Sequence, residues 1–181
     1  MDDDLARWAG DLLGRLHSLP CRAQATPVRD VCWHLEKLRL NIGKMAKAGN
    51  LARTTAEHIL QLAADLKPPD VEVGLIHGDF CGENIVIDRS GNPIAVDNEH
   101  ITLGALDYDL VKCWYRWPMT PSQRLAFREC YQSYRSTLPA IEHFRFWSIC
   151  SLANSARIRA EHGRDLQPSL QGLLRVTGAR C

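Results

Sequence analysis

Three oxygen-bearing side chains in the middle of the chain have the types and spacing that phosphoryl transfer requires. Asp79 lies in the segment Leu-Ile-His-Gly-Asp-Phe-Cys-Gly-Glu-Asn at positions 75–84, five residues before Asn84. Asp97 follows Asn84 by thirteen residues. An aspartate can take the proton of an attacking hydroxyl, while magnesium binds carboxylate and amide oxygens and holds nucleotide phosphates. We therefore predict that Asp79 is a catalytic base and that Asn84 and Asp97 are Mg²⁺ ligands.

Two short strands joined by a turn are predicted to bring the two metal ligands together. The runs Ile85-Val-Ile87 and Ile94-Ala-Val96 are apolar and rich in β-branched residues, and Arg89-Ser-Gly-Asn92 between them is typical of a turn. In such a hairpin Asn84 stands just before the first strand and Asp97 just after the second. The hairpin therefore provides the proximity that a shared metal ion needs.

A zinc site is an alternative interpretation of the same segment, with ligands drawn from His77, Asp79, Cys81 and Glu83. These residue types bind zinc, but the segment lacks the paired Cys-x-x-Cys or His-x-x-x-His spacing that zinc sites usually show. A lone His-x-Asp at a strand end is also more often a structural hydrogen-bonded pair than a site. The ordered combination of apolar run, His-Gly-Asp, Asn, hairpin and second Asp favours phosphoryl transfer.

Helices are predicted on both sides of the hairpin from apolar periodicity and capping residues. Before it, the pattern predicts a helix that begins at Leu5, with the acidic residues 2–4 at its N-terminus, and stops at Pro20. Two further helices are predicted from Val28 to Gly49 and from Thr54 to Leu66. Thr54 and Glu57 have the spacing of a capping box, as do Thr120 and Gln123. After the hairpin, a loop containing Gly104 is expected, followed by helices over about 107–116, 121–137, 140–162 and 168–177. The fold class is therefore α+β and mostly helical.

Length and composition predict one domain spanning residues 1–181. A chain of this length with 45% hydrophobic residues can bury one core. No segment approaches the ~20 consecutive apolar residues of a membrane span, and the acidic start Met-Asp-Asp-Asp is unlike a signal peptide. The seven cysteines are scattered without the spacing of a disulfide framework. We therefore expect reduced thiols, a cytoplasmic location and no membrane partner.

The net charge of +1 is unevenly distributed along the chain. Residues 1–111 hold 11 Lys and Arg against 17 Asp and Glu, whereas residues 112–181 hold 11 against 4, a local excess of +7. The basic residues are dispersed and not clustered with aromatic side chains. Nucleic-acid binding is therefore not expected.

The central segment resembles a known family of small-molecule kinases. Protein kinases carry His-Arg-Asp-x-x-x-x-Asn, with the same spacing from Asp to Asn, followed by Asp-Phe-Gly. Here Gly78 replaces the Arg and Asp97-Asn98-Glu99 replaces Asp-Phe-Gly. This form resembles the aminoglycoside phosphotransferase and choline kinase-like family. The segment Gly104-Ala-Leu-Asp-Tyr-Asp-Leu110 is similar to the family's Gly-x-x-x-x-Asp-Leu-Ala element.

The resemblance implies a protein-kinase-like C-terminal lobe whose small β-hairpin carries the catalytic and metal loops. It also implies ATP and Mg²⁺ as cofactors and a small-molecule hydroxyl as phosphoryl acceptor. In the family, the aspartate that matches Asp109 usually supports the catalytic loop through the histidine that matches His77. Glu99 matches an acidic position often found two residues after the metal-binding aspartate.

Nothing in the sequence resembles the N-terminal nucleotide-binding lobe of such kinases. Only residues 1–4 precede the first predicted helix, and no Gly-x-Gly-x-x-Gly or Val-Ala-x-Lys occurs. The five lysines of the chain all lie in or beside helical patterns, at Lys37, Lys44, Lys47, Lys67 and Lys112. Because that lobe normally holds the α- and β-phosphates, its absence predicts weak or no activity for the chain alone.

Two function classes follow for a chain with these features. In the first, it is the catalytic and substrate-binding lobe of a kinase, completed by a partner chain or by self-association over the face of the missing lobe. In the second, it is an inactive, shortened homologue that binds a ligand or a protein. Because the family's C-terminal helices line the acceptor pocket, the +7 excess there predicts a neutral or anionic acceptor and not a strongly cationic one.

Overall fold

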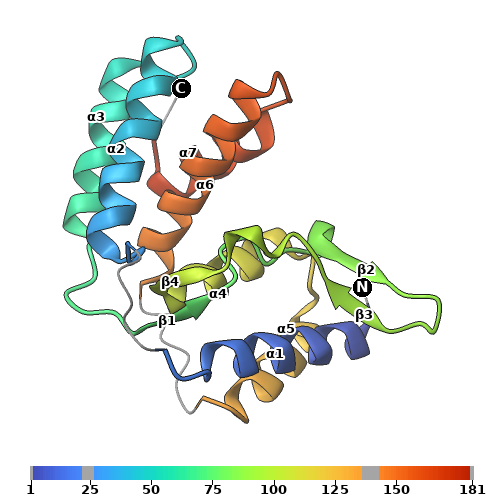
Figure 1. Cartoon of the computed structure of the whole chain (residues 1–181). Helices are drawn as coiled ribbons and strands as arrows, with labels where there is room; N and C mark the ends of the chain where they lie inside the picture. Colours follow the sequence, from blue (N-terminus) through green and yellow to red (C-terminus); the bar gives the residue numbers. More distant parts are fainter. Residues whose placement is uncertain (1, 22–26, 136–142, 180–181) are drawn as a thin grey trace. The chain divides into compact units, whose positions relative to one another are not determined.

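The computed structural model describes three stretches of the chain, residues 2–21, 27–135 and 143–179 (Figure 1). The chain divides into two compact units. Unit 1 is built from Met1–Arg29 and Val71–Glu142, and unit 2 from Asp30–Asp70 and His143–Cys181. Each unit therefore combines two segments that are distant in sequence. A single domain over the whole chain stays a prediction.

Unit 1 holds every predicted site residue, and it is built from helices and two small antiparallel sheets. Its helices are α1 (Asp3–His17), α4 (Leu106–Arg116) and α5 (Pro121–Gln132). Its strands are β1 (Val73–Ile76), β2 (Ile85–Ile87), β3 (Pro93–Ala95) and β4 (Thr102–Ala105). Two 3-10 turns, η1 (Gly82–Asn84) and η2 (Asn98–His100), lie at the ends of the β2–β3 hairpin. Helices α1 and α5 pack lengthwise against each other (Figure 1).

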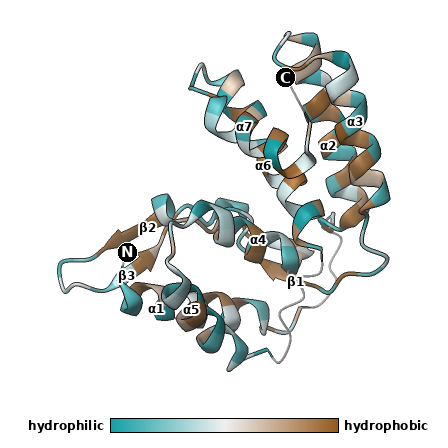
Figure 2. Ribbon diagram, turned by 180° about the vertical axis from the view of Figure 1, so that it is seen from behind, coloured by the Kyte–Doolittle hydropathy of each residue, from teal (hydrophilic) through white to brown (hydrophobic). Residues whose placement is uncertain are grey.

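The predicted hairpin is present as β2 and β3. Val86 pairs with Ile94, and Asp88 closes the turn by accepting hydrogen bonds from the backbone N–H groups of Ser90 and Asn92, both at 2.8 Å. Figure 2 shows that both strands are largely hydrophobic. Their apolar side chains are nevertheless exposed, by 45% at Val86, 59% at Ile87 and 46% at Ile94. Unit 1 therefore presents an uncovered apolar surface on this hairpin.

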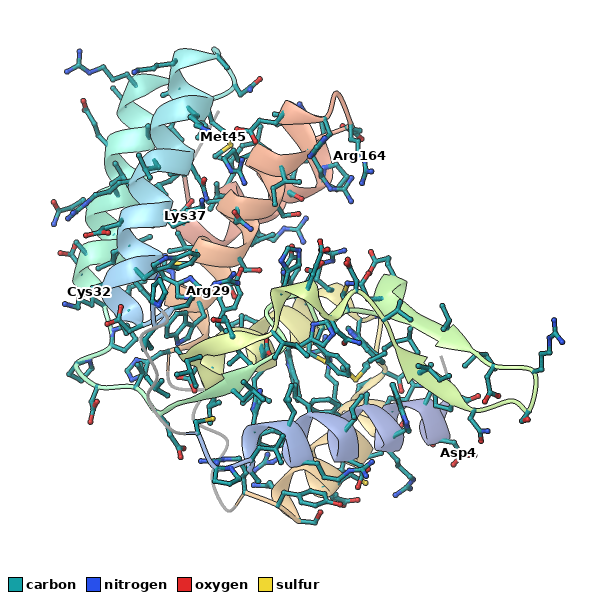
Figure 3. The ribbon with its side chains drawn as sticks, in the orientation of Figure 1. Asp4, Arg29, Cys32, Lys37, Met45 and Arg164 are labelled. Carbon is teal, nitrogen blue, oxygen red and sulfur yellow. The ribbon has the colours of Figure 1, made fainter. Side chains whose placement is uncertain are left out.

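The sequence predicted a loop around Gly104, but the structure has strand β4 there, paired with β1. Gly104 lies opposite Gly74, and a Cβ atom on Gly104 would come within 2.4 Å of the Ile76 side chain. The backbone of Arg29, which is labelled in Figure 3, bridges to the other side of β4 at Gly104. The glycine that suggested a loop is therefore required for close packing within the strand.

Unit 2 is helical, with α2 (Val31–Lys47), α3 (Arg53–Asp65), α6 (Phe144–Glu161) and α7 (Gln167–Thr177). Helix α6 packs against α2 and α7, and α2 packs against α3. Met45 of α2, labelled in Figure 3, is fully buried in this core. No helix in the described stretches is long and apolar enough to cross a membrane.

One of the two predicted capping boxes is confirmed and the other is wrong. Thr120 caps α5 by accepting the backbone N–H of Gln123, whose side chain returns a hydrogen bond to Thr120. Helix α3 instead begins one residue before Thr54, after the N-cap Ala52. Glu57 is consequently inside the helix, where it forms an ion pair with Arg53 at 2.9 Å. The i, i+4 pair replaces the predicted cap.

The other helices follow the predicted pattern, which confirms a mostly helical fold with small antiparallel sheets. Helix α1 begins after Asp2, whose carboxylate accepts the backbone N–H of Leu5 at 2.8 Å. Helix α2 begins at Val31, three residues later than predicted, because Asp30 caps it through the backbone N–H of Trp33. Helix α5, which was predicted to run to about residue 137, ends at Gln132, and residues 133–135 are not helical. The predicted end near 137 and the predicted start of the next helix near 140 lie outside the described residues.

Two glycines inside helices provide a matched test of this packing. A Cβ atom on Gly10 of α1 would come within 2.2 Å of the backbone oxygen of Phe127 in α5, whereas one on Gly43 of α2 meets nothing within 4 Å. We expect Gly10→Ala to lower the free energy of unfolding by about 1–3 kcal/mol through overpacking. Gly43→Ala should raise it by up to about 1 kcal/mol through helix propensity. Urea unfolding of both variants measures this, and a stability gain in Gly10→Ala would contradict the α1–α5 packing.

Candidate active site

The carboxylate of Asp79 is held from two sides. Lys112 of α4 forms an ion pair with its Oδ1 atom, and Asn84 donates Nδ2–H to its Oδ2 atom at 3.2 Å. The same Nδ2 group donates to the backbone oxygen of Asp79 at 2.9 Å. The side chain of Asp79 is 26% exposed. The carboxylate is therefore fixed in orientation and still within reach of a ligand.

The surroundings of Asp79 keep it ionised. Burial alone would raise the pKa of Asp79, but the charge and hydrogen bond of Lys112 outweigh burial and hold that pKa below its ordinary value. The charge of Arg116 and the amide of Asn84 lower the pKa of Asp79 further. At neutral pH the group is a carboxylate, so it can accept a hydrogen bond from a hydroxyl.

The hairpin brings the two predicted metal ligands to the same end of the paired strands. Ile85 pairs with Ala95, and the backbone N–H of Val96 donates to the backbone oxygen of Asn84 at 2.9 Å. Asp97 is the next residue along the chain. The Nδ2 group of Asn84 donates hydrogen bonds to Asp79, so the Oδ1 atom of Asn84 is the one left to face a cation.

Asp97 has an unusual backbone conformation. Its φ of 63° and ψ of 44° are left-handed, and among the described residues it is the one non-glycine with a positive φ. Aspartate tolerates this region better than most residues, and such conformations concentrate at functional sites. The conformation is the turn by which the chain leaves β3 and enters η2.

Asp109 anchors the loop that carries Asp79. Its fully buried carboxylate accepts the backbone N–H of His77 at 2.6 Å and that of Gly78 at 2.8 Å. His17 of α1 lies 3.5 Å from the same carboxylate and 2.9 Å from the hydroxyl of Tyr131 in α5. Burial alone would raise the pKa of Asp109, but His17 and the two backbone N–H groups hold it below its ordinary value.

Asp109 supports the loop through the backbone N–H of His77 and not through its imidazole ring. The family resemblance implied support through this histidine without saying which of its groups is used. The ring is buried against Phe80, and its Nδ1 atom accepts the backbone N–H of Asp79 at 3.3 Å. Within the described part of the chain, its Nε2 atom has no hydrogen-bond partner. His77 therefore shapes the turn before Asp79.

The backbone conformation and surroundings of Gly78 explain why this chain has glycine where protein kinases have arginine. Its φ is 79°, and a Cβ atom there would come within 2.8 Å of the backbone oxygen of His100. Both the torsion and the contact exclude a larger residue without rearrangement. The turn into the loop that carries Asp79 is therefore built around this glycine.

Sequence reasoning missed Lys112. It lies three residues after Asp109 on α4, so both side chains are on the same helix face. Its Nζ atom donates to the backbone oxygen of Gly78 at 2.9 Å besides pairing with Asp79. The i, i+3 spacing from Asp109 is the signal that could have identified it. One turn later, Arg116 pairs with Glu83 at 2.9 Å.

The remaining predictions have weaker structural counterparts. Glu99 lies in η2, is 76% exposed and has its carboxylate 3.8 Å from the imidazole of His100. For zinc, the described residues contain no group of three or more His, Cys, Asp or Glu that could hold a metal ion. A magnesium site made by one amide oxygen and one carboxylate is a different donor set.

A family model matches most of the chain. The sequence model described as the phosphotransferase enzyme family matches residues 2–144, which include every predicted site residue. None of the curated proteins compared with this chain matches its sequence significantly.

Solved structures with the same kinase-like fold are similar to most of this chain. An aminoglycoside-3'-phosphotransferase of type VIII has a TM-score of 0.66 and 17% identity, covering 80% of this chain and 58% of that chain. Choline kinase LicA from Streptococcus pneumoniae has a TM-score of 0.69 and 16% identity, covering 97% of this chain and 66% of that one. LicA in complex with AMP has a TM-score of 0.70 and 15% identity, covering 97% of this chain and 65% of that one. This chain thus spans less than two thirds of each.

The pKa of Asp109 predicts how stability depends on pH. Because the folded-state pKa of Asp109 lies below its unfolded value of about 3.9, the stability it contributes is present above about pH 4. That contribution is lost as the pH falls through the folded-state pKa. Asp109→Asn places an amide nitrogen against backbone donors, so we expect a loss of about 1–3 kcal/mol at pH 7 and a flatter pH dependence in acid.

Urea unfolding between pH 7 and pH 3 measures both effects. The control is Asp4→Asn, at an exposed position in the first turn of α1, which should change stability by no more than about 0.5 kcal/mol. An Asp109→Asn variant with wild-type stability at pH 7 would show that the loop does not depend on this carboxylate.

Proposed function

The chain belongs to the phosphotransferase enzyme family, and we propose that it is the catalytic and acceptor-binding lobe of a small-molecule kinase that uses ATP and Mg²⁺. The observation that supports this proposal most strongly is the ionised carboxylate of Asp79, held in place beside Asn84 at the end of the hairpin that leads to Asp97. A base, an amide oxygen and a second carboxylate are the groups that phosphoryl transfer to a hydroxyl needs.

The donor set fits magnesium. Oδ1 of Asn84 and the carboxylate of Asp97 are hard oxygen ligands, and one or two carboxylates are the usual protein contribution to a magnesium–nucleotide site. When bound there, the ion would neutralise charge on the nucleotide phosphates. The AMP complex of LicA, whose fold is similar, supports a nucleotide as the other cofactor.

Asp79 is proposed to orient the acceptor and take its proton. Its carboxylate accepts a hydrogen bond from the hydroxyl, which directs the hydroxyl oxygen toward the transferring phosphoryl group. Because the pKa of Asp79 is lowered, the group is a weak base. We therefore expect proton transfer to Asp79 late, as the new oxygen–phosphorus bond forms and the hydroxyl becomes acidic.

A complete site is proposed to need a second nucleotide-binding element. Kinases hold the α- and β-phosphates with a lysine and a glycine-rich cover, and the sequence contains neither motif. The exposed apolar side chains of Val86, Ile87 and Ile94 support a partner chain or a second copy of this chain covering the hairpin. The chain alone is then expected to have little transferase activity.

The alternative function is a binding module without catalysis. One observation favours it: each oxygen of the Asp79 carboxylate already has a partner, Lys112 on one side and Asn84 on the other. A ligand or protein could then use the exposed hairpin surface without phosphoryl transfer.

The acceptor is proposed to be a neutral or anionic hydroxyl compound. Lys112 and Arg116 both lie close enough to Asp79 to lower its pKa, so the surroundings of the base contain two cationic side chains. Like charge in a desolvated pocket is unfavourable for a strongly cationic acceptor. Tight binding of a kanamycin-like polycation in a thermal-shift assay would contradict this proposal.

Nucleotide binding by the chain tests the proposed function. Calorimetric titration with the magnesium complex of a non-hydrolysable ATP analogue should show weak binding, because the sequence has neither the glycine-rich motif nor the lysine motif that hold the α- and β-phosphates in kinases. Asp97→Asn should weaken that binding at least about tenfold, equivalent to about 1.4 kcal/mol. The matched control is Asp65→Asn in α3 of unit 2, which should bind like the wild type.

Turnover provides the second arm of this experiment. Wild type and Asp79→Asn are compared with radiolabelled ATP and a panel of sugars, amino acids and amino alcohols. Robust phosphorylation that Asp79→Asn abolishes would establish the enzyme and refute the need for a second element. Wild-type nucleotide affinity in Asp97→Asn would refute the assigned site.

A further inference from the structure

Lys112 places a buried positive charge against the catalytic loop. The residue is only 7% exposed, although lysine is among the residues least often buried. Its Nζ atom donates to the backbone oxygen of Gly78 at 2.9 Å and forms the ion pair with Asp79. It also lies 5.7 Å from the centre of the Tyr108 ring. Its hydrogen-bonding partners in the structure are thus both on the loop that carries the proposed base.

The lysine remains charged in this position. Burial alone would lower the pKa of Lys112, but Tyr108 and Asp79, with Asp109, together raise it above its ordinary value. A buried ammonium is unfavourable unless it is paired and hydrogen-bonded. The loop therefore supplies the groups that make burial of Lys112 tolerable, and Lys112 in turn holds those groups.

Two residues of α4 hold the two backbone polar groups of Gly78. Asp109 accepts the N–H of Gly78, and Lys112 donates to the C=O of Gly78. Asp79 follows directly, and its side chain is the third partner of this helix face. The rotamer of Asp79 is therefore set by the helix as well as by the loop.

We propose that Lys112 is a positioning residue for Asp79, a role that rests on the proposed function of Asp79 as the base. Lys112 holds the Oδ1 atom of Asp79, so the acceptor hydroxyl meets the carboxylate on its Oδ2 side. Asn84 also bonds to Asp79 on that side. Lys112 thereby links the orientation of the base to the orientation of Asn84, a proposed Mg²⁺ ligand. Loss of Lys112 should change the alignment of the reacting groups more than the affinity for either substrate.

If Lys112 only stabilised the fold, the protein would behave differently. Removal of Lys112 would then lower the melting temperature but leave the orientation of Asp79 and Asn84 unchanged. The side-chain amide of Asn84 distinguishes the two cases, because its Nδ2–H bonds to Asp79 report where that carboxylate lies.

The test is NMR of the folded chain without nucleotide or acceptor, so its outcome does not depend on phosphoryl transfer. Lys112→Met removes charge and hydrogen bonds, and Lys112→Gln keeps a donor for Gly78 should the methionine variant not fold. We expect both to move the side-chain amide signal of Asn84 and the carboxyl signal of Asp79. Arg53→Gln, which loses the exposed ion pair with Glu57 in α3 of unit 2, should leave both signals in place.

Kinetics extend the test if the chain or its complex with a partner turns over an acceptor. Lys112→Met should lower kcat by roughly 10- to 100-fold and change KM for the acceptor less than about threefold, because misalignment mainly slows the chemical step. Lys112→Arg, which keeps the charge, should recover part of the loss. Unchanged Asn84 and Asp79 signals in folded Lys112→Gln would overturn the proposal, even if nucleotide binding supports the kinase function.

Discussion

The site depends on one buried carboxylate, Asp109, and on the backbone groups that satisfy it. The chain leaves β1 at His77, so the N–H groups of His77 and Gly78 have no strand partner and need another acceptor. Asp109 supplies it from α4 and is itself fully buried, so neither side is satisfied without the other. Helix α4 and the loop after β1 are therefore fixed to each other, and this fixes the position of Asp79.

This arrangement joins stability to function within unit 1. His17 and Tyr131 extend the hydrogen-bonded network from Asp109 into α1 and α5, the pair of helices whose close packing needs Gly10. From the same face of α4, Lys112 extends it to Asp79, the proposed base. A change in the packing of α1 and α5 would thus reach the base through contacts already present. Preorganisation of this kind is what phosphoryl transfer needs, because the protein contributes mainly position and charge.

The local parts of this architecture could be predicted from the sequence. The hairpin follows from β-branched runs around a turn, and the helices from apolar periodicity. The spacing of Asp79, Asn84 and Asp97 indicated a common site because a hairpin connects them. The missed features are tertiary. Gly104 is accepted in β4 because the Ile76 side chain occupies the space of a Cβ atom, and Lys112 looks like any helical lysine until α4 is placed beside Gly78.

The central claim is that Asn84 and Asp97 hold the divalent ion beside Asp79. Anomalous diffraction from crystals soaked with Mn²⁺ and a non-hydrolysable ATP analogue tests it most directly. We predict a manganese peak bonded to Oδ1 of Asn84 and to the carboxylate of Asp97, at oxygen distances close to the roughly 2.0–2.1 Å of magnesium. Manganese bound only at Glu99 or at the acidic start of α1, with no peak between Asn84 and Asp97, would contradict it.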